Sequence, residues 1–220
     1  MSEWSIIWEA RDLFFAGIWN TLVLFVLSFV AAFVLGCGML FLLEERTRLS
    51  IVLRWVINLM RMLPFLILAY LLYYGLPQLG LRMSAWTAGL IALTIYHAAY
   101  IAEILRGARI VLPAGQIEAA KAHGFRPFRL FYRILLPQLV IKTRPLLGNQ
   151  LIYALKDTAF LTIITVQELT AAANSVQATY FIPTEAFVVV IFFYWIISIA
   201  LELALKWAGR FGAKRGFEHV

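Results

Sequence analysis

The stretch LFFAGIWNTLVLFVLSFVAAFVLGCGMLFLL, residues 13–43, contains no Asp, Glu, Lys or Arg. A helix needs about 20 apolar residues to cross a hydrocarbon core of about 30 Å, and this run is longer than that. It therefore predicts a membrane-spanning helix. A membrane β-barrel is excluded because its strands would show alternating segments of about 10 residues, which this run lacks.

Four further apolar runs follow, each long enough to cross a membrane. A backbone in lipid must satisfy its own hydrogen bonds, so each run is expected to be helical. We predict five spans, at Leu13–Leu43, Leu49–Leu76, Ser84–Leu105, Leu146–Glu168 and Thr184–Lys206.

The composition excludes a soluble domain. Of 220 residues, 63% are hydrophobic and 14% are charged, with a mean hydropathy of +0.85. About half of the residues being apolar is already ordinary for a soluble protein. We expect one all-α integral-membrane domain over residues 1–220. The single cysteine, Cys37, closes no internal disulfide, and the acidic first dozen residues do not resemble a cleavable leader.

Basic residues are concentrated in alternate connections. The second connection has only Arg82, the N-terminal segment has only Arg11, and residues 169–183 have no Lys or Arg. The positive-inside rule then places the N-terminus outside and the C-terminus in the cytosol. The net charge of +7 is mainly this topology signal, with anionic lipid as a secondary partner and no nucleic acid expected. The basic connections hold Arg46, Arg48 and Arg54, then Arg106, Arg109, Lys121, Arg126, Arg129, Arg133, Lys142 and Arg144, and in the tail Arg210, Lys214 and Arg215.

The N-terminal segment Trp4–Phe15 has two interpretations. Its aromatic and aliphatic side chains have helix-like spacing, which fits a helix lying flat at the outer interface. A frayed end anchored by tryptophans fits equally well.

The third connection, at about residues 106–145, is too long to be without structure. Its signals predict two short helices. The first covers about Ala114–His123 and stops at Gly124, and the second starts near Pro127 and ends before Pro137. The alanines beside Glu118 would let another protein approach closely. A solvated amphipathic helix with a salt bridge is the alternative.

The segment EAAKAHGFRPFRLFYRILLP, residues 118–137, resembles the EAA loop of ABC-importer permeases. The matching residues are Glu118, Ala119, Ala120, Gly124, Ile134, Leu136 and Pro137. The stretches GIWNTL (17–22), AAYIAEILRGA (98–108), LPAGQIEAA (112–120) and LGNQLIYALKDTAFLTIITVQEL (147–169) look like the polar-amino-acid (histidine/glutamine/arginine-type) branch of that family.

This resemblance implies a five-span permease of the type I importer kind in a bacterial inner membrane. Such permeases pair with a second permease, identical or related, and receive substrate from an extracytoplasmic binding protein. Two ATP-binding subunits would bind the loop helix through Glu118, Ala119, Ala120 and Gly124. They would also hold ATP and Mg, because this chain has no P-loop.

Lys156 and Asp157 lie near the middle of the fourth predicted span, about 15 Å deep. A charge there costs at least about 2.5 kcal/mol, so each is expected to face a partner or a wet cavity. Arg61 and Pro64 lie at the same depth in the second span, which the proline is expected to break. A broken helix offers free N–H groups to an anion. Asp157 with Arg61 would then receive the two charges of an amino acid. A packing network of Lys156, Asp157 and Arg61, or a dimer contact, are the alternatives.

The remaining polar and apolar neighbours complete this tentative substrate site. Gln150 and Thr158 are nearby polar candidates. Members of the family commonly have Arg-Gly-Thr-Pro where this chain has Arg61, Met62, Leu63 and Pro64. The two bulky apolar residues leave open that the partner permease holds the substrate.

Three classes of function are compared. The leading one is an ATP-driven amino-acid permease subunit that works by alternating access and is not itself an enzyme. The second is a standalone ion-coupled transporter with Asp157 as its coupling site. The third is a membrane enzyme, for which no catalytic set is found. Three scattered histidines and one cysteine predict no metal site.

Overall fold

The computed structural model describes residues 3–44 and 48–213, and these are almost entirely helical. Arg46, Lys214 and Arg215, which carried part of the topology argument, lie outside the described residues. The helices are α1 (Glu3–Glu9), α2 (Arg11–Glu44), α3 (Arg48–Met62), α4 (Phe65–Tyr70), η1 (Leu71–Gly75), η2 (Leu76–Leu79), α5 (Ala85–Ile110), α6 (Ala114–Ala122), α7 (Pro127–Leu130), η3 (Phe131–Leu135), α8 (Leu136–Lys142), α9 (Arg144–Asp157), η4 (Thr158–Ile164), α10 (Leu169–Tyr180) and α11 (Pro183–Ala213).

Helices α2, α5 and α11 are long and apolar enough to cross a membrane alone. They confirm the first, third and fifth predicted spans. The second and fourth are each a pair of helices joined at a bend, of 106° between α3 and the segment 65–79 and of 45° between the segment 144–164 and α10. The total reaches five if each bent pair counts as one span.

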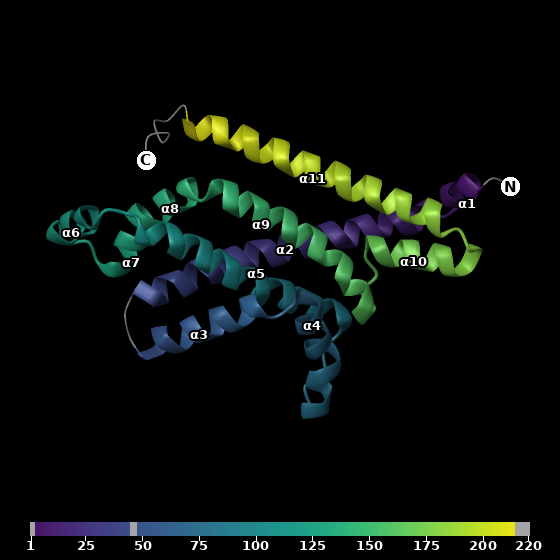
Figure 1. Cartoon of the computed structure of the whole chain (residues 1–220), viewed down its shortest axis with the longest axis horizontal. Helices are drawn as coiled ribbons and strands as arrows, with labels where there is room; N and C mark the ends of the chain where they lie inside the picture. Colours follow the sequence, from purple (N-terminus) through teal and green to yellow (C-terminus); the bar gives the residue numbers. More distant parts are fainter. Residues whose placement is uncertain (1–2, 45–47, 214–220) are drawn as a thin grey trace.

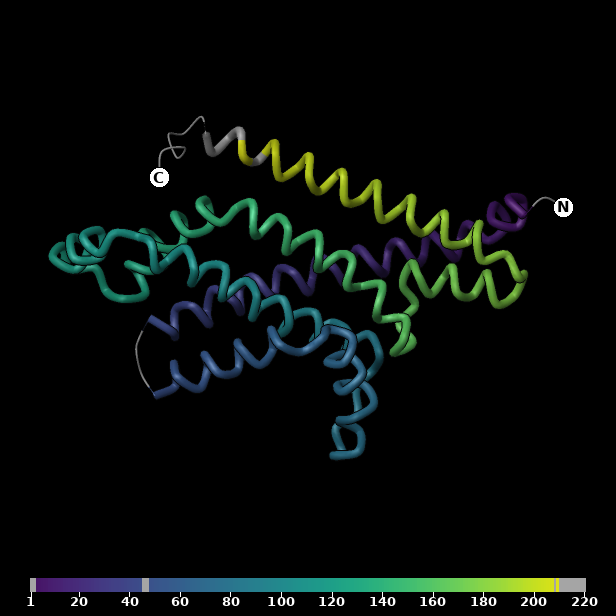
Figure 2. The backbone as a smooth tube through the Cα atoms, viewed as in Figure 1, coloured from purple at the N-terminus to yellow at the C-terminus, as the bar shows by residue number. Residues whose placement is uncertain are grey.

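The predicted break at Pro64 is confirmed. Helix α3 ends at Met62, and Pro64 adopts an extended conformation before α4 begins at Phe65. Proline has no N–H for the helical ladder and its ring clashes with the preceding turn. The consequence is a sharp change of direction, which Figure 2 shows as the segment that turns away below the bundle.

The centre of the bundle is the packing of α2 against α5. Small residues make the close approach possible, since a Cβ added to Gly36 would lie 2.9 Å from the Ala98 carbonyl oxygen. The buried core around it includes Leu40, Ile101 and Leu105. Figure 1 shows these two helices crossing through the middle of the molecule, with α3 on one side and α9 and α11 on the other.

The connection expected at residues 169–183 contains a helix that the sequence reading missed. Helix α10 begins at Leu169 because the Glu168 carboxylate accepts hydrogen bonds from the backbone N–H groups of Thr170 and Ala171, both at 2.8 Å. Thr165, with φ of 69°, ends the preceding 3₁₀ turn and redirects the chain. The first part of the fourth span thus ends at Ile164, four residues before the predicted end at Glu168, and the chain continues into a capped helix.

The predicted pair of helices in the third connection is confirmed at its start and wrong at its end. Helix α7 begins at Pro127, but the helical run continues through Pro137 as far as Lys142. A wider π-turn, η3, lies just before Pro137. In that turn the Leu136 N–H donates to the Phe131 oxygen, five residues back, so the proline ring does not meet a regular turn.

The helix ends next to the basic connections and those next to the connections poor in Lys and Arg lie, in part, at opposite ends of the bundle. In Figure 1 the C-terminal end of α2, the start of α3, helix α6 and the C-terminal end of α11 lie at one end, and α1 and α10 lie at the other. Helix α1 packs against α2 and α11, while Trp4 and Trp8 are exposed. A short ordered helix is therefore present, rather than a frayed end. The side of the membrane that each end faces stays a prediction.

Candidate functional site

Asp157 meets its partner at the middle of α5. Its carboxylate lies 3.4 Å from His97 Nε2, and His97 Nδ1 lies 2.7 Å from Gln150 Nε2. The His97 side chain is 1% exposed and that of Asp157 is 18% exposed. His97 is therefore hydrogen-bonded to Gln150 of α9 and lies close to Asp157, while its Nε2 has no hydrogen-bond partner among the described residues.

Lys156 points the other way. Its side chain is exposed, and no ion pair from its ammonium to another described residue is found. Adjacent residues on a helix point about 100° apart, so Lys156 and Asp157 do not share a face. A packing network of Lys156, Asp157 and Arg61 is not formed within the described part of the chain.

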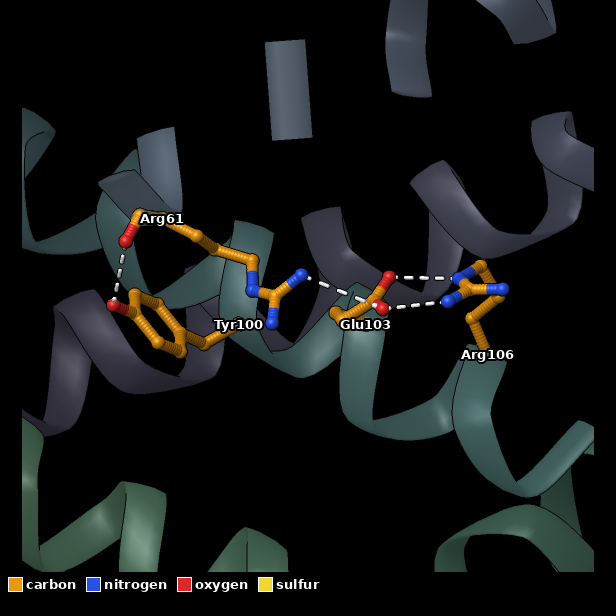
Figure 3. A network of polar contacts seen from close by, with 4 residues as sticks. All are labelled: Arg61, Tyr100, Glu103 and Arg106. Carbon is orange, nitrogen blue, oxygen red and sulfur yellow. Dashed lines mark hydrogen bonds and ion pairs between the residues drawn. The ribbon is translucent and has the colours of Figure 1, made fainter. Parts of the chain in front are cut away.

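Arg61 is bound to α5 instead. Its Nη1 lies 3.4 Å from Glu103 Oε1, and its backbone oxygen accepts a hydrogen bond of 3.1 Å from the Tyr100 hydroxyl. Glu103 also accepts two hydrogen bonds from Arg106, at 2.6 and 2.7 Å. Figure 3 shows this network, in which Glu103 lies between the two arginines. Glu103 and Arg106 are three residues apart on one helix face, and Arg61 of α3 joins this pair from the neighbouring helix.

The two charged groups are separated along α5. Glu103 follows His97 by six residues, which corresponds to about 9 Å along a helix axis. Arg61 therefore lies nearer the end of the bundle that carries α6. It also lines a cavity of about 450 Å³ with Tyr100, Glu103 and Lys142. A solute that touched both Asp157 and Arg61 would have to extend along this side of α5.

Aromatic rings fill the space between these groups. Phe65, the first residue of α4, packs against Tyr96, His97 and Phe160, with ring centroids 5.4 to 6.4 Å apart. The start of α4 therefore lies beside Asp157, and its first N–H groups point back toward the break. Met62 is 79% exposed, Pro64 is exposed and Leu63 is half-buried. Met62 is thus directed away from the other tentative site residues.

Thr158 belongs to a different set of contacts. Its hydroxyl donates to the Leu155 oxygen at 2.6 Å and lies 3.2 Å from the Tyr194 hydroxyl. Tyr194 in turn donates to Glu168 at 3.2 Å. Glu168 is fully buried, and sequence reasoning missed it because it treated this residue only as the end of a span. No standard cap signal marks Glu168, because the preferred N-cap residues are Ser, Thr, Asp and Asn.

The coupling candidates lie on an ordered projection. Glu118 and Ala119 are exposed, whereas Ala120 is buried in the same core cluster as Leu40 of α2 and Leu105 of α5. Gly124 has φ of +75°, and the Phe125 N–H donates to the Ala120 oxygen at 3.1 Å, which together close the helix. No ion pair of Glu118 is found among the described residues, so its carboxylate is available to an outside partner. The salt-bridged alternative is not supported.

Comparisons with known proteins agree with each other. The family model described as "Binding-protein-dependent transport system inner membrane component" matches residues 28–211. The probable glutamine ABC transporter permease protein GlnM of Bacillus subtilis (strain 168) is 30% identical over 207 residues, covering 92% of this chain and 94% of its own. The octopine transport system permease protein OccM of Rhizobium meliloti is 36% identical over 191 residues, covering 82% and 78%. A solved amino acid ABC transporter with histidines superposes with a TM-score of 0.83 at 28% identity, covering 96% of this chain and 99% of its own.

Proposed function

Since this chain belongs to the family of binding-protein-dependent transport system inner membrane components, we propose that it carries polar amino acids or their derivatives across a bacterial inner membrane by alternating access. It is a helical membrane protein of the ABC amino-acid permease type, and it acts as the transmembrane subunit of an importer. ATP and Mg would be held by two separate ATP-binding subunits. A second permease and an extracytoplasmic solute-binding protein complete the proposed assembly.

The observation that supports coupling is the way α6 is built into the bundle. Its exposed face offers Glu118 and Ala119, while Ala120 and Leu112 pack in one core cluster with α2 and α5. When ATP draws the two ATP-binding subunits together, a rigid helix gripped by them would displace the ends of both span helices. The bends at Pro64 and Thr165 would let other segments change direction.

The substrate proposal is supported by charge placement. Asp157 offers a partly exposed carboxylate to an ammonium group, and Arg61 offers a half-exposed guanidinium to a carboxylate. Gln150 holds His97 in place, so it positions the site rather than facing the solute. The relatives named for glutamine and octopine transport both handle amino-acid-like compounds. A zwitterion that extends along α5 is therefore the proposed cargo.

Lys156 fits contact with the second permease better than it fits the substrate site. It shares an exposed face of α9 and η4 with Tyr153 and Phe160, which are 60% and 47% exposed. A buried apolar interface with one ammonium would suit another copy of this chain or a related chain.

The test is reconstitution of the full complex in proteoliposomes, with uptake of labelled glutamine and octopine measured. We expect uptake to require the ATP-binding subunits and ATP on the side that carries α6. An ion gradient alone should drive none. Uptake by the permease without the ATP-binding subunits, driven by protons or sodium, would contradict the proposal and favour the ion-coupled alternative.

A further inference from the structure

A cluster of arginines lies at the end of the bundle that carries α6 and has no role in the proposed transport cycle. Arg48 and Arg54 of α3, with Arg106 and Arg109 of α5, line a pocket of about 660 Å³ that also contains Glu44 of α2. Four cations against one lining anion give this pocket a strong positive charge.

Two of the four arginines are already neutralised. Arg109 donates two hydrogen bonds to Glu44, at 2.9 and 3.2 Å, and Arg106 is held by Glu103. Arg48 and Arg54 are exposed, and neither has an ion pair with another described residue. Among the residues that the structure describes, the pocket therefore has an excess of about two positive charges.

The surroundings of these arginines are apolar. Ile51 and Ile110, which line the same pocket, are 61% and 66% exposed. Trp55, which follows Arg54, is 73% exposed, and tryptophans favour the boundary between lipid tails and headgroups. Exposed apolar walls beside unpaired guanidinium groups match a molecule that is anionic at one end and apolar at the other.

The position of the pocket along the bundle favours a lipid over a protein as its ligand. Helix α6 projects beyond the ends of α2 and α3 in Figure 1, so a subunit that grips α6 lies farther out than the pocket. The pocket is thus at the level of the membrane surface. Given the proposed orientation, this surface is the cytoplasmic leaflet, where acidic lipids are enriched and where basic pockets between helices bind their headgroups.

We propose that this pocket binds the phosphate headgroup of an acidic phospholipid. Arg48 and Arg54 contact the phosphate, and the acyl chains lie along Ile51, Ile110 and Trp55. The lipid supplies the negative charge that the described residues lack, and it connects the start of α3 to the end of α5.

Native mass spectrometry of the complex purified with its ATP-binding subunits tests this, after delipidation and titration with phosphatidylglycerol or phosphatidylcholine. The wild-type complex should retain phosphatidylglycerol preferentially. Removing both charges in R48Q/R54Q should weaken that binding by about tenfold or more. R48K/R54K should retain most of it, because the charge is kept. R11Q/R82Q removes two arginines that do not line this pocket and should leave the binding unchanged.

Four results would overturn the proposal. One is equal retention of the two lipids by the wild-type complex. Another is loss of phosphatidylglycerol in R11Q/R82Q to the same extent as in R48Q/R54Q. The third is full displacement by millimolar inorganic phosphate, which would assign the site to a free anion. Should R48Q/R54Q fail to assemble, the lipid preference and the phosphate competition of the wild-type complex decide alone. Loss of the ATP-binding subunits from R48Q/R54Q with phosphatidylglycerol retained would identify a protein interface instead.

Discussion

His97 Nε2 lies 3.4 Å from Asp157 Oδ2, and this contact links the middle of α5 to the end of α9. It gives Asp157 a polar environment inside a bundle in which an isolated carboxylate would be costly. The carboxylate is still 18% exposed, so it is not enclosed. In the proposed site, the ammonium group of the solute contacts this exposed part of the carboxylate.

We expect Asp157→Asn to lower ATP-driven uptake by about ten- to hundredfold. The change keeps the shape but removes the charge, and a hydrogen bond to a charged group contributes about 1.5–3 kcal/mol. Uptake by the reconstituted complex is the measurement, with substrate affinity followed in parallel. Glu9→Gln is the matched control, because it removes a carboxylate charge from an exposed side chain of α1 that is not part of the proposed site. Near-normal uptake with unchanged affinity in D157N would place the substrate site in the partner permease.

Arg61 and Glu103 should show energetic coupling. They lie 3.4 Å apart on α3 and α5, and both are partly exposed, so solvent screens the pair. We expect a coupling free energy of about 0.5–1.5 kcal/mol from a double-mutant cycle of R61Q, E103Q and R61Q/E103Q, measured by unfolding in detergent. Arg106→Gln should also couple to E103Q, because it shares the same carboxylate. Additive effects of R61Q and E103Q would show that the pair contributes nothing.

The sequence predicted those parts of the fold that depend on local pattern. Apolar length placed α2, α5 and α11 to within a few residues, and Pro64 marked a real break. The predicted end of a helix before Pro137 was wrong, because a π-turn precedes the proline and the helix continues through it. Helix α10 was missed because its first turn is satisfied by a buried side chain, Glu168, whose role depends on tertiary contacts.

The contacts of the candidate site were harder to predict from the sequence than the helices, because they join residues on separate helices. Helical spacing alone brings Glu103 and Arg106 together, because they are three residues apart on one helix. No local rule pairs Arg61 with Glu103, or Asp157 with His97, because only the packing of separate helices brings them together. Adjacency of Lys156 and Asp157 suggested one site, whereas the helix turns them to different faces.

Glu118→Lys should uncouple the complex. The carboxylate is exposed at the projecting helix, so reversing its charge would repel a basic partner without disturbing the core. We expect substrate-stimulated ATP hydrolysis to fall by more than about tenfold, since breaking a charge pair at an interface costs about 2–5 kcal/mol. Glu9→Lys, a reversal at the opposite end of the bundle, is the control. Full hydrolysis and uptake in E118K would remove α6 from the coupling route.

Gly124→Ala tests whether the closed end of α6 matters. Gly124 has φ of +75°, which an alanine adopts only at a cost of about 1 kcal/mol. Gly115, within the same helix, has no such φ, and a Cβ meets nothing within 4 Å at either position. G115A should therefore be neutral or stabilising while G124A lowers both thermal stability and coupled ATP hydrolysis. Equal behaviour of the two variants would mean that the left-handed turn is not required.

Glu168 should contribute more to stability than an exposed helix cap. Its fully buried carboxylate accepts hydrogen bonds from the N–H groups of Thr170 and Ala171 and from the Tyr194 hydroxyl. E168A leaves the N–H groups of Thr170 and Ala171 without their acceptor and leaves Thr158 as the remaining partner of the Tyr194 hydroxyl, and we expect a loss of about 2–4 kcal/mol in the free energy of unfolding.

The exposed cap Ser84 of α5 provides the comparison, because its hydroxyl accepts from the Thr87 N–H at 3.1 Å and water can replace it. S84A should cost about 1 kcal/mol or less. E168Q should lie between E168A and wild type, since an amide keeps only one of the two acceptor oxygens and turns a donor toward an N–H group. Denaturant unfolding in detergent measures all three variants. A stability of E168Q equal to wild type would show that the carboxylate is protonated or dispensable, and that α10 is held by Thr21, which accepts from the Leu169 N–H at 3.1 Å.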